Sequence, residues 1–217
     1  MKYGESTFDI LYLLIAIIGG ILLLKKARTG TERLMGWAVL ILGCGDAFHL
    51  VPRVLNYFVV ADFTVALGLG KLVTSLTMTV FYVLMYRIYL GYYGETENRQ
   101  VTRTIYTLAA ARALLCLFPQ NGWLQNESSV LWGVVRNVPF VALGALIVAL
   151  YHGARSRTRR FRHVWLYVTL SFLFYIPVAV AAALLPMLGM LMLPKTICYI
   201  LLIAVFWQAV TKDAARA

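Results

Sequence analysis

The stretch DILYLLIAIIGGILLLKKARTGTERL (residues 9–34) joins an apolar run to a short basic segment, and this unit decides the fold. A helix that spans a bilayer needs about 20 mostly apolar residues, which the run 9–24 approaches. The run has neither a basic leader nor a small-residue cleavage site, so we interpret it as a permanent span rather than a signal peptide.

The same alternation of apolar runs and short polar segments continues to the end of the chain. Of the 217 residues, 61% are hydrophobic and 13% are charged, and the mean hydropathy is +0.78. A soluble domain carries roughly a quarter of its residues as charged side chains. The composition therefore predicts an all-α, polytopic membrane protein that forms a single membrane domain over residues 1–217. We expect seven transmembrane helices, at 9–24, 35–60, 62–88, 104–119, 129–151, 163–186 and 189–211.

The basic residues predict the orientation of these helices. They gather in alternate connections, at 25–34, 89–103 and 152–162, whereas the connections around Asp62, at 120–128 and at 186–189 contain no Lys or Arg. Fourteen of the 20 basic residues fall on one side and only Lys2 falls on the other. Short cytoplasmic loops accumulate Lys and Arg. We therefore expect the N-terminus outside, the C-terminus inside, and the chain integral to the cell membrane.

A net charge of +11 would suggest a nucleic-acid partner in a soluble protein. Here the charge is explained by membrane orientation, so no nucleic-acid partner is expected.

An internal repeat divides the predicted bundle. Shifting the chain by 125 residues places Gly19 on Gly144 and Pro52 on Pro177, and a shift of 124 places Lys71 on Lys195. These matches predict two parallel three-helix repeats, at 8–89 and 129–211, joined by a linker helix at 104–119. Transporters built from such repeats bind their substrate near the midplane, where the repeats meet.

This three-plus-one-plus-three plan resembles that of the SWEET sugar transporters and the nicotinamide-riboside carriers, which implies a transport function. More distantly it resembles the microbial opsins, which hold retinal on a lysine of the last helix, where Lys195 lies here. The third predicted helix carries Lys71 in place of a counter-ion acid, and Lys195 follows Pro194 near a helix end. We therefore expect neither retinal nor any other cofactor.

Ionisable residues inside the predicted helices identify a candidate site. Each charge placed in hydrocarbon costs at least about 2.5–3.5 kcal/mol, so such residues face protein or water and usually serve a function. Asp46, His49 and Arg53 follow one another at i, i+3 and i+7 and share one helix face. Similar polar stripes start at Lys71 and at Lys195. We expect these stripes to converge on a cavity in the outer half of the membrane.

Charge balance favours an anionic ligand for that cavity. Five cations face one carboxylate, Asp46, and unpaired buried cations are costly unless something neutralises them. Guanidinium groups match carboxylate and phosphate oxygens in bidentate fashion. The predicted ligand-binding residues are Arg53, Lys71, Ser75, Arg112, Arg136, Tyr175, Lys195 and Tyr199.

The remaining site residues allow two interpretations each. Asp46 and His49 are candidates for proton coupling, because histidine titrates near physiological pH, or they form a structural ion pair with Arg53. Pro52 and Pro177 are candidate hinges, because a proline inside a helix kinks it, or they are kinks without a function.

These observations predict a membrane transporter with a basic cavity for a small anionic metabolite. One alternative is an intramembrane enzyme acting on a lipid or phosphorylated substrate, with Asp46 and His49 as acid and base and Ser75 as nucleophile. A second alternative is a seven-helix ligand sensor. Only one histidine lies inside the predicted helices, so no metal site is expected. The expected partners are a small anionic solute or a lipid head group, together with the membrane lipids; the oligomeric state stays open.

Overall fold

The computed structural model describes residues 2–126, 129–181 and 185–213, and within these ranges it contains helices and no strands. The predicted all-α class is therefore confirmed for the described part of the chain. The seven α-helices are α1 (Lys2–Lys26), α2 (Gly30–Phe58), α3 (Thr64–Tyr93), α4 (Arg99–Leu117), α5 (Val130–Gly153), α6 (Val164–Ala181) and α7 (Met192–Asp213). Two 3₁₀ helices, η1 (Pro119–Asn121) and η2 (Pro186–Leu191), lie in connections.

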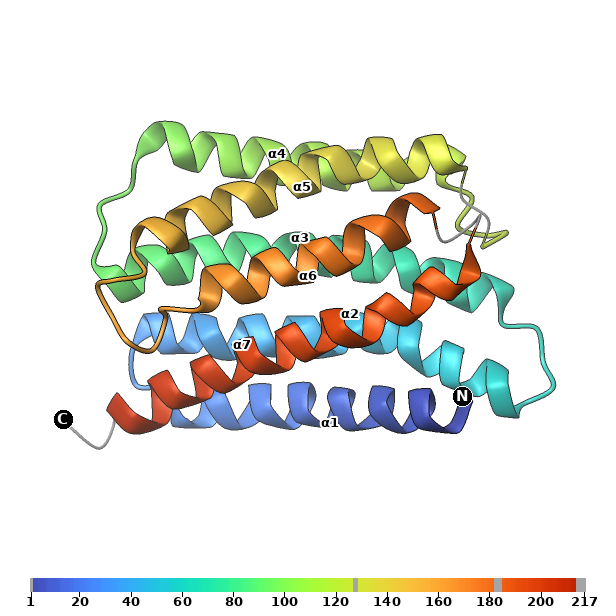
Figure 1. Cartoon of the computed structure of the whole chain (residues 1–217), viewed down its shortest axis with the longest axis horizontal. Helices are drawn as coiled ribbons and strands as arrows, with labels where there is room; N and C mark the ends of the chain where they lie inside the picture. The colour runs from blue at the N-terminus through green and yellow to red at the C-terminus, as the bar shows by residue number, and fades with distance from the viewer. Residues whose placement is uncertain (1, 127–128, 182–184, 214–217) are drawn as a thin grey trace.

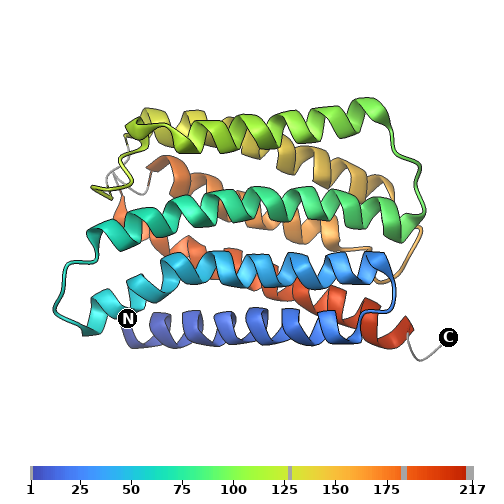
Figure 2. The ribbon, with the colours of Figure 1, turned by 180° about the vertical axis from the view of Figure 1, so that it is seen from behind.

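Helices that follow one another in the chain run in opposite directions, whereas α1 and α7 run in the same direction (Figure 1). Each helix packs against the next in the chain, and α7 packs against α1. The connections at 27–29, 94–98 and 154–163 lie at one end, which we call the basic end (Figures 1 and 2). The N-terminus and the connections at 59–63, 118–126 and 185–191 lie at the opposite end, here called the loop end.

The outer surface of the bundle is apolar. Five segments are long and apolar enough to cross a membrane: α1, α2, α3, α5 and Met187–Thr211. A shorter apolar helix covers Val164–Val180. Large aliphatic side chains on the outer face of α1 are exposed, among them Ile10, Leu14 and Ile18. Soluble monomers rarely expose apolar patches of this extent, so the bundle is that of a membrane protein.

Local capping signals set the helix starts at both ends. The side chain of Thr29 accepts a hydrogen bond from the backbone of Glu32, and the Glu32 carboxylate accepts from the backbone of Thr29, which forms a capping box at the start of α2. Asn98 and Ser129 cap α4 and α5 with their side chains. Each cap satisfies backbone N–H groups that the first helical turn leaves without a partner.

Three predicted helix boundaries near the site are wrong. The first helix begins at Lys2 rather than at residue 9. Its polar first two turns, ahead of the apolar run, belong to the same helix, which packs against α2. The predicted helix 163–186 ends at Ala181, its residues 182–184 lie outside the described part, and α7 starts at Met192 rather than 189. Pro186 opens η2, and a proline disfavours helical backbone in the residue before it.

Large aromatic side chains fill the half of the bundle toward the basic end. Tyr82, Tyr86, Tyr151, Phe161 and Phe206 are all fully buried there in one continuous core. The Tyr151 hydroxyl donates a hydrogen bond to the backbone oxygen of Met85 at 2.9 Å. The described core toward the basic end is therefore closely packed.

Candidate functional site

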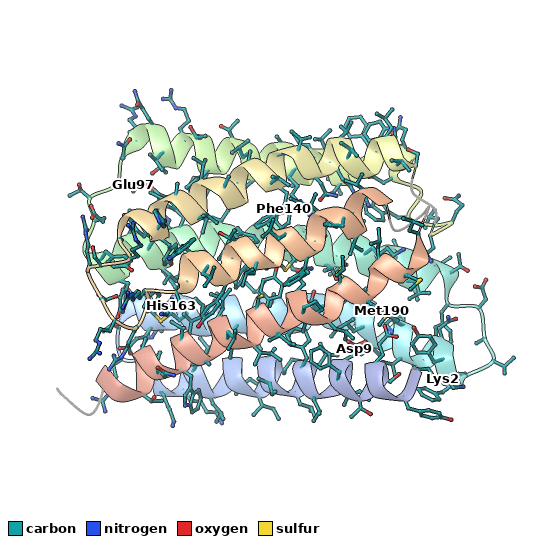
Figure 3. All side chains as sticks on the ribbon, in the orientation of Figure 1. Lys2, Asp9, Glu97, Phe140, His163 and Met190 are labelled. Carbon is teal, nitrogen blue, oxygen red and sulfur yellow. The ribbon has the colours of Figure 1, made fainter. Side chains whose placement is uncertain are left out.

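A cavity of about 550 Å³ lies in the loop-end half of the bundle, and every helix from α2 to α7 contributes to its wall. Figure 3 locates it along the bundle: Phe140 lies between the two ends, while Met190 and Lys2 mark the loop end and Glu97 marks the basic end. Asn126 and Ser129, next to the start of α5, also line the cavity. Its volume falls in the range of pockets that hold small molecules, roughly 300–1,000 Å³.

The cavity brings together all five predicted intramembrane cations, each from a different helix. They are Arg53 on α2, Lys71 on α3, Arg112 on α4, Arg136 on α5 and Lys195 on α7. Three further predicted residues line the same space: His49, Ser75 and Tyr175. Among the described lining residues there is no Asp or Glu. The cavity wall is therefore strongly positive.

Arg112 is the most deeply buried of these cations, with 2% of its surface exposed. Its guanidinium donates to the side-chain oxygen of Asn137 at 3.0 Å and lies over the ring of Phe140, 3.4 Å from the centroid. The same Asn137 oxygen accepts a hydrogen bond from the Tyr175 hydroxyl at 2.7 Å. Arg112 Nε has no hydrogen-bond partner within the described residues. A neutral amide and a ring thus hold this guanidinium where a carboxylate would be the usual partner.

Asn137 is oriented by its second hydrogen bond. Its side-chain nitrogen donates to the backbone oxygen of Gly133 at 2.8 Å, which directs the side-chain oxygen toward Arg112 and Tyr175. This bond explains why one asparagine can serve two donors from different helices. Asn137 was missed by the sequence analysis, which singled out only ionisable residues and their stripes.

Arg136 and Lys195 lie closer to the loop end and are supported by aromatic rings. Arg136 donates to the side-chain oxygen of Asn121 at 2.8 Å and lies 4.5 Å from the Trp123 ring centroid. The Lys195 ammonium lies 4.9 Å from the centroid of Tyr175 and 5.5 Å from that of Tyr199. Such cation–π contacts stabilise a cation without neutralising it.

The connection after α4 folds inward to make this support possible. Asn121 is fully buried, and its side-chain nitrogen donates to the backbone oxygens of Leu115, Cys116 and Phe118. Gly68 on α3 allows the approach, because a Cβ there would stand 1.6 Å from the backbone oxygen of Trp123.

The pairing of Arg53 corrects the predicted charge balance. Its guanidinium forms an ion pair with Glu5 of α1, and the Tyr57 hydroxyl donates to the other Glu5 oxygen at 3.1 Å. Asp9, one turn farther along α1, is also buried, with 5% of its surface exposed. Asp46 is therefore not the only carboxylate close to the predicted cations. Glu5, Asp9 and Tyr12 follow at i, i+4 and i+7 on one face of α1, and the predicted start at residue 9 left Glu5 out of this stripe.

Lys71, Arg112 and Lys195 differ from Arg53 in their charge partners. Arg53 forms an ion pair with Glu5. None of the other three forms an ion pair with a described carboxylate.

Four predicted site residues are not part of the described cavity wall: the hinges Pro52 and Pro177, and Asp46 and Tyr199. Asp46 accepts a hydrogen bond from the Tyr12 hydroxyl at 2.6 Å, between α1 and α2. It lies seven residues before Arg53 along α2 and is not one of the described lining residues. Tyr199 is 2% exposed and packs edge-on against Phe81 at 5.9 Å. It contacts Lys195 from beneath rather than lining the cavity.

The arrangement considered for an enzyme is not assembled. The Ser75 hydroxyl donates to the backbone oxygen of Lys71 at 2.8 Å, and Asp46 is bonded to Tyr12. Nδ1 of His49 is buried without a hydrogen-bond partner among the described residues. No recorded hydrogen bond of the described chain joins these three side chains. Nor does any group of three or more His, Cys, Asp or Glu side chains there approach the geometry of a metal site.

Aromatic rings close the cavity toward the basic end. The Phe140 ring lies 5.3 Å from Tyr82, 5.0 Å from Phe172 and 5.8 Å from Tyr175 between centroids. Gly144 makes room for this cluster, because a Cβ there would stand 2.1 Å from the Phe172 ring. We call Tyr82, Phe140 and Phe172 the aromatic plug.

Prolines interrupt three of the helices around the cavity. Pro52 lies inside α2, Pro177 inside α6 and Pro139 inside α5. The first two, predicted as hinges, adjoin the lining residues Arg53 and Val178.

When compared with protein-family models, with curated proteins and with solved structures, the chain matches none of them.

Proposed function

We propose that this chain is a membrane transporter that binds a small anion in its basic cavity. The observation that carries the proposal is the convergence of five cations from five helices on one space whose described lining contains no carboxylate. A dry cavity of this charge would be strongly unfavourable. A bound carboxylate or phosphate would neutralise it, and Arg112 and Arg136 offer the planar donor sets that such groups prefer.

The proposed topology has seven spans, with the N-terminus outside and the C-terminus inside the cell membrane. It is supported by the basic residues in and beside the connections 27–29, 94–98 and 154–163, which lie together at one end of the bundle, because cytoplasmic loops accumulate Lys and Arg. In this orientation the cavity faces outward, and the aromatic plug separates it from the cytoplasm.

Transport would require the plug to open and the loop end to close. Pro52 and Pro177 are the proposed hinges, because a proline removes one helical hydrogen bond and weakens the helix locally. Asp46 and His49 stay candidates for proton coupling.

Two parallel three-helix repeats, α1–α3 and α5–α7, are proposed on the sequence matches of Pro52 with Pro177 and Lys71 with Lys195. A superposition of the two units in the parallel sense should place each of these pairs within one helical turn. A better fit in the inverted sense would overturn the repeat.

Proteoliposomes containing the purified protein provide the test of transport. Radiolabelled inorganic phosphate, succinate and octanoate would be offered from outside, with empty liposomes and the variant Lys71→Gln as controls. We expect saturable uptake of at least one unchanged anion, and its loss in the variant. Chemical conversion of a probe would favour the enzyme instead, and binding without uptake would favour the sensor.

A further inference from the structure

The apolar residues that line the cavity are concentrated on one side of it. Apart from Met78, every apolar residue of the described lining comes from α5, α6, η2 or α7. The side formed by α2, α3 and α4 carries His49, Arg53, Lys71 and Arg112, together with Thr74 and Ser75. The side formed by α5, α6 and α7 also carries Arg136, Asn137, Tyr175 and Lys195. The apolar residues beside them would not serve an inorganic anion, so they require a separate explanation.

The apolar side is concentrated where α5 begins and α6 ends. Val130 and Gly133 line the cavity from α5, and the successive residues Val178, Ala179 and Val180 line it from α6. Successive residues of a helix point about 100° apart, at 3.6 residues per turn. Three in a row can therefore line one space only if the cavity extends around the end of α6.

This side of the cavity reaches the outer surface of the bundle. Val130 and Val180 line the cavity and are also 40% and 42% exposed. The neighbouring η2 segment places Met187 and Met190 on the surface, with 81% and 50% exposed. In a membrane-embedded bundle such apolar surface faces acyl chains rather than water. The cavity wall is therefore continuous with the lipid-facing surface between α5 and α6.

We infer that the ligand is an amphipathic organic anion, with its charged group against the cations and an apolar chain along the α5–α6 side. The inference rests on the proposed function, whose anion site it deepens. Arg112 and Lys71 hold the carboxylate or phosphate, and the chain extends past Gly133 and Ala179 toward Val130 and Val180. A fatty acid and a single-chain lipid phosphate share this chemistry.

A chain-length series tests the inference. Protein in nanodiscs would be titrated with butyrate, octanoate, dodecanoate and dodecyl phosphate, with inorganic phosphate as the chainless probe and empty nanodiscs subtracted. Burial of one CH₂ is worth about 0.8 kcal/mol. We therefore expect affinity to rise roughly threefold to fourfold for each added methylene until the apolar side is filled. The two dodecyl probes distinguish a fatty acid from a lipid phosphate.

Paired variants test whether the alkyl chain of the ligand lies along the α5–α6 side of the cavity. Val130→Asn and Val180→Asn should flatten the chain-length dependence and leave the affinity for butyrate unchanged. Leu131→Asn is the matched control, because Leu131 is adjacent to Val130, 69% exposed and not part of the described lining. Leu131→Asn should show the same dependence of affinity on ligand chain length as the unsubstituted protein. Variants that fail to fold would show a lowered Tm without ligand, and Val130→Thr would then replace Val130→Asn.

Each other outcome counts against a defined claim. If inorganic phosphate or butyrate binds as tightly as dodecanoate, the amphipathic ligand is overturned while the anion site stands. If affinity rises with the length of the alkyl chain but Leu131→Asn abolishes the rise as fully as Val130→Asn, the alkyl chain of the ligand does not lie in the cavity. If no probe binds in excess of empty nanodiscs, the proposed anion site fails together with the inference.

Discussion

Arg53 is shared between the cavity, whose wall it forms, and Glu5 of α1, with which it forms an ion pair. About a quarter of each side chain is exposed, 26% for Arg53 and 22% for Glu5. An anion entering the cavity would therefore compete with Glu5 for the same guanidinium. This competition connects α1, which contributes no described residue to the cavity wall, to the binding of the ligand.

Removing the competing carboxylate should tighten anion binding. In Glu5→Gln the Arg53 charge becomes fully available to the ligand, and a partly exposed ion pair is worth up to about 1 kcal/mol. We expect a twofold to fivefold lower Kd for the binding anion, measured by titration in nanodiscs. Glu97→Gln is the matched control, since it breaks the ion pair of Glu97 with Arg87 at the basic end. A weaker affinity in Glu5→Gln would refute the competition.

Lys71 offers the clearest single test of the cationic wall. It lines the cavity, and no described carboxylate pairs with it. Replacement by Gln should weaken anion binding by about 1.5–3 kcal/mol, the worth of a charge-assisted hydrogen bond. The exposed Lys25 at the basic end provides the control, Lys25→Gln, which should bind as before. An unchanged Kd in Lys71→Gln would mean that the anion does not contact this helix.

Asn137→Asp should place a counter-charge inside the site without changing its shape. The new carboxylate would neutralise Arg112, which already donates to this position at 3.0 Å. Anion affinity should then fall at least tenfold, because the ligand loses one cation and meets a negative charge. The variant loses the hydrogen bond that Asn137 donates to the Gly133 backbone oxygen, but the buried Arg112 gains a charged partner, so its Tm should change little. Retention of full affinity would show that Arg112 does not contact the anion.

Asp46 should affect stability more than binding. Asp46→Asn keeps an acceptor for the Tyr12 hydroxyl and is expected to leave the Kd within about threefold, because Asp46 lies outside the described lining. Asp46→Leu leaves a buried hydroxyl without its acceptor, which costs about 1–3 kcal/mol of unfolding free energy. A thermal denaturation series with the Tyr12→Phe/Asp46→Leu double variant measures this coupling. Additive losses in the double variant would contradict it.

The orientation can be tested with impermeant thiol reagents on intact cells. In a Cys44→Ala background, which removes the exposed native thiol, a cysteine at Gln125 should react from outside. A cysteine at Ser156 in the basic connection should react only after the cells are opened. Both positions are exposed; the nearby Ser128 lies outside the described residues. The reverse pattern of labelling would invert the topology.

The candidate site was predictable in part because intramembrane charge is rare. Arg53, Lys71, Arg112, Arg136 and Lys195 stand out in apolar helices, and the cost of exposing them to hydrocarbon predicts that they turn inward. Asn137 carries no such signal. Its importance comes from two donors on other helices, Arg112 and Tyr175, that meet at one oxygen.

The sequence by itself determined the helical class, the apolar outer surface and the identity of the buried cations. These properties follow from composition and spacing along single helices, since backbone hydrogen bonds in a bilayer must close within each helix. Only the tertiary structure decided partners and placement: that Glu5 pairs with Arg53, that Asp46 is bonded to Tyr12 outside the cavity lining, and that the plug closes one end. Such contacts join residues far apart in the chain, and they depend on how helices are rotated and shifted against each other, which no local pattern encodes.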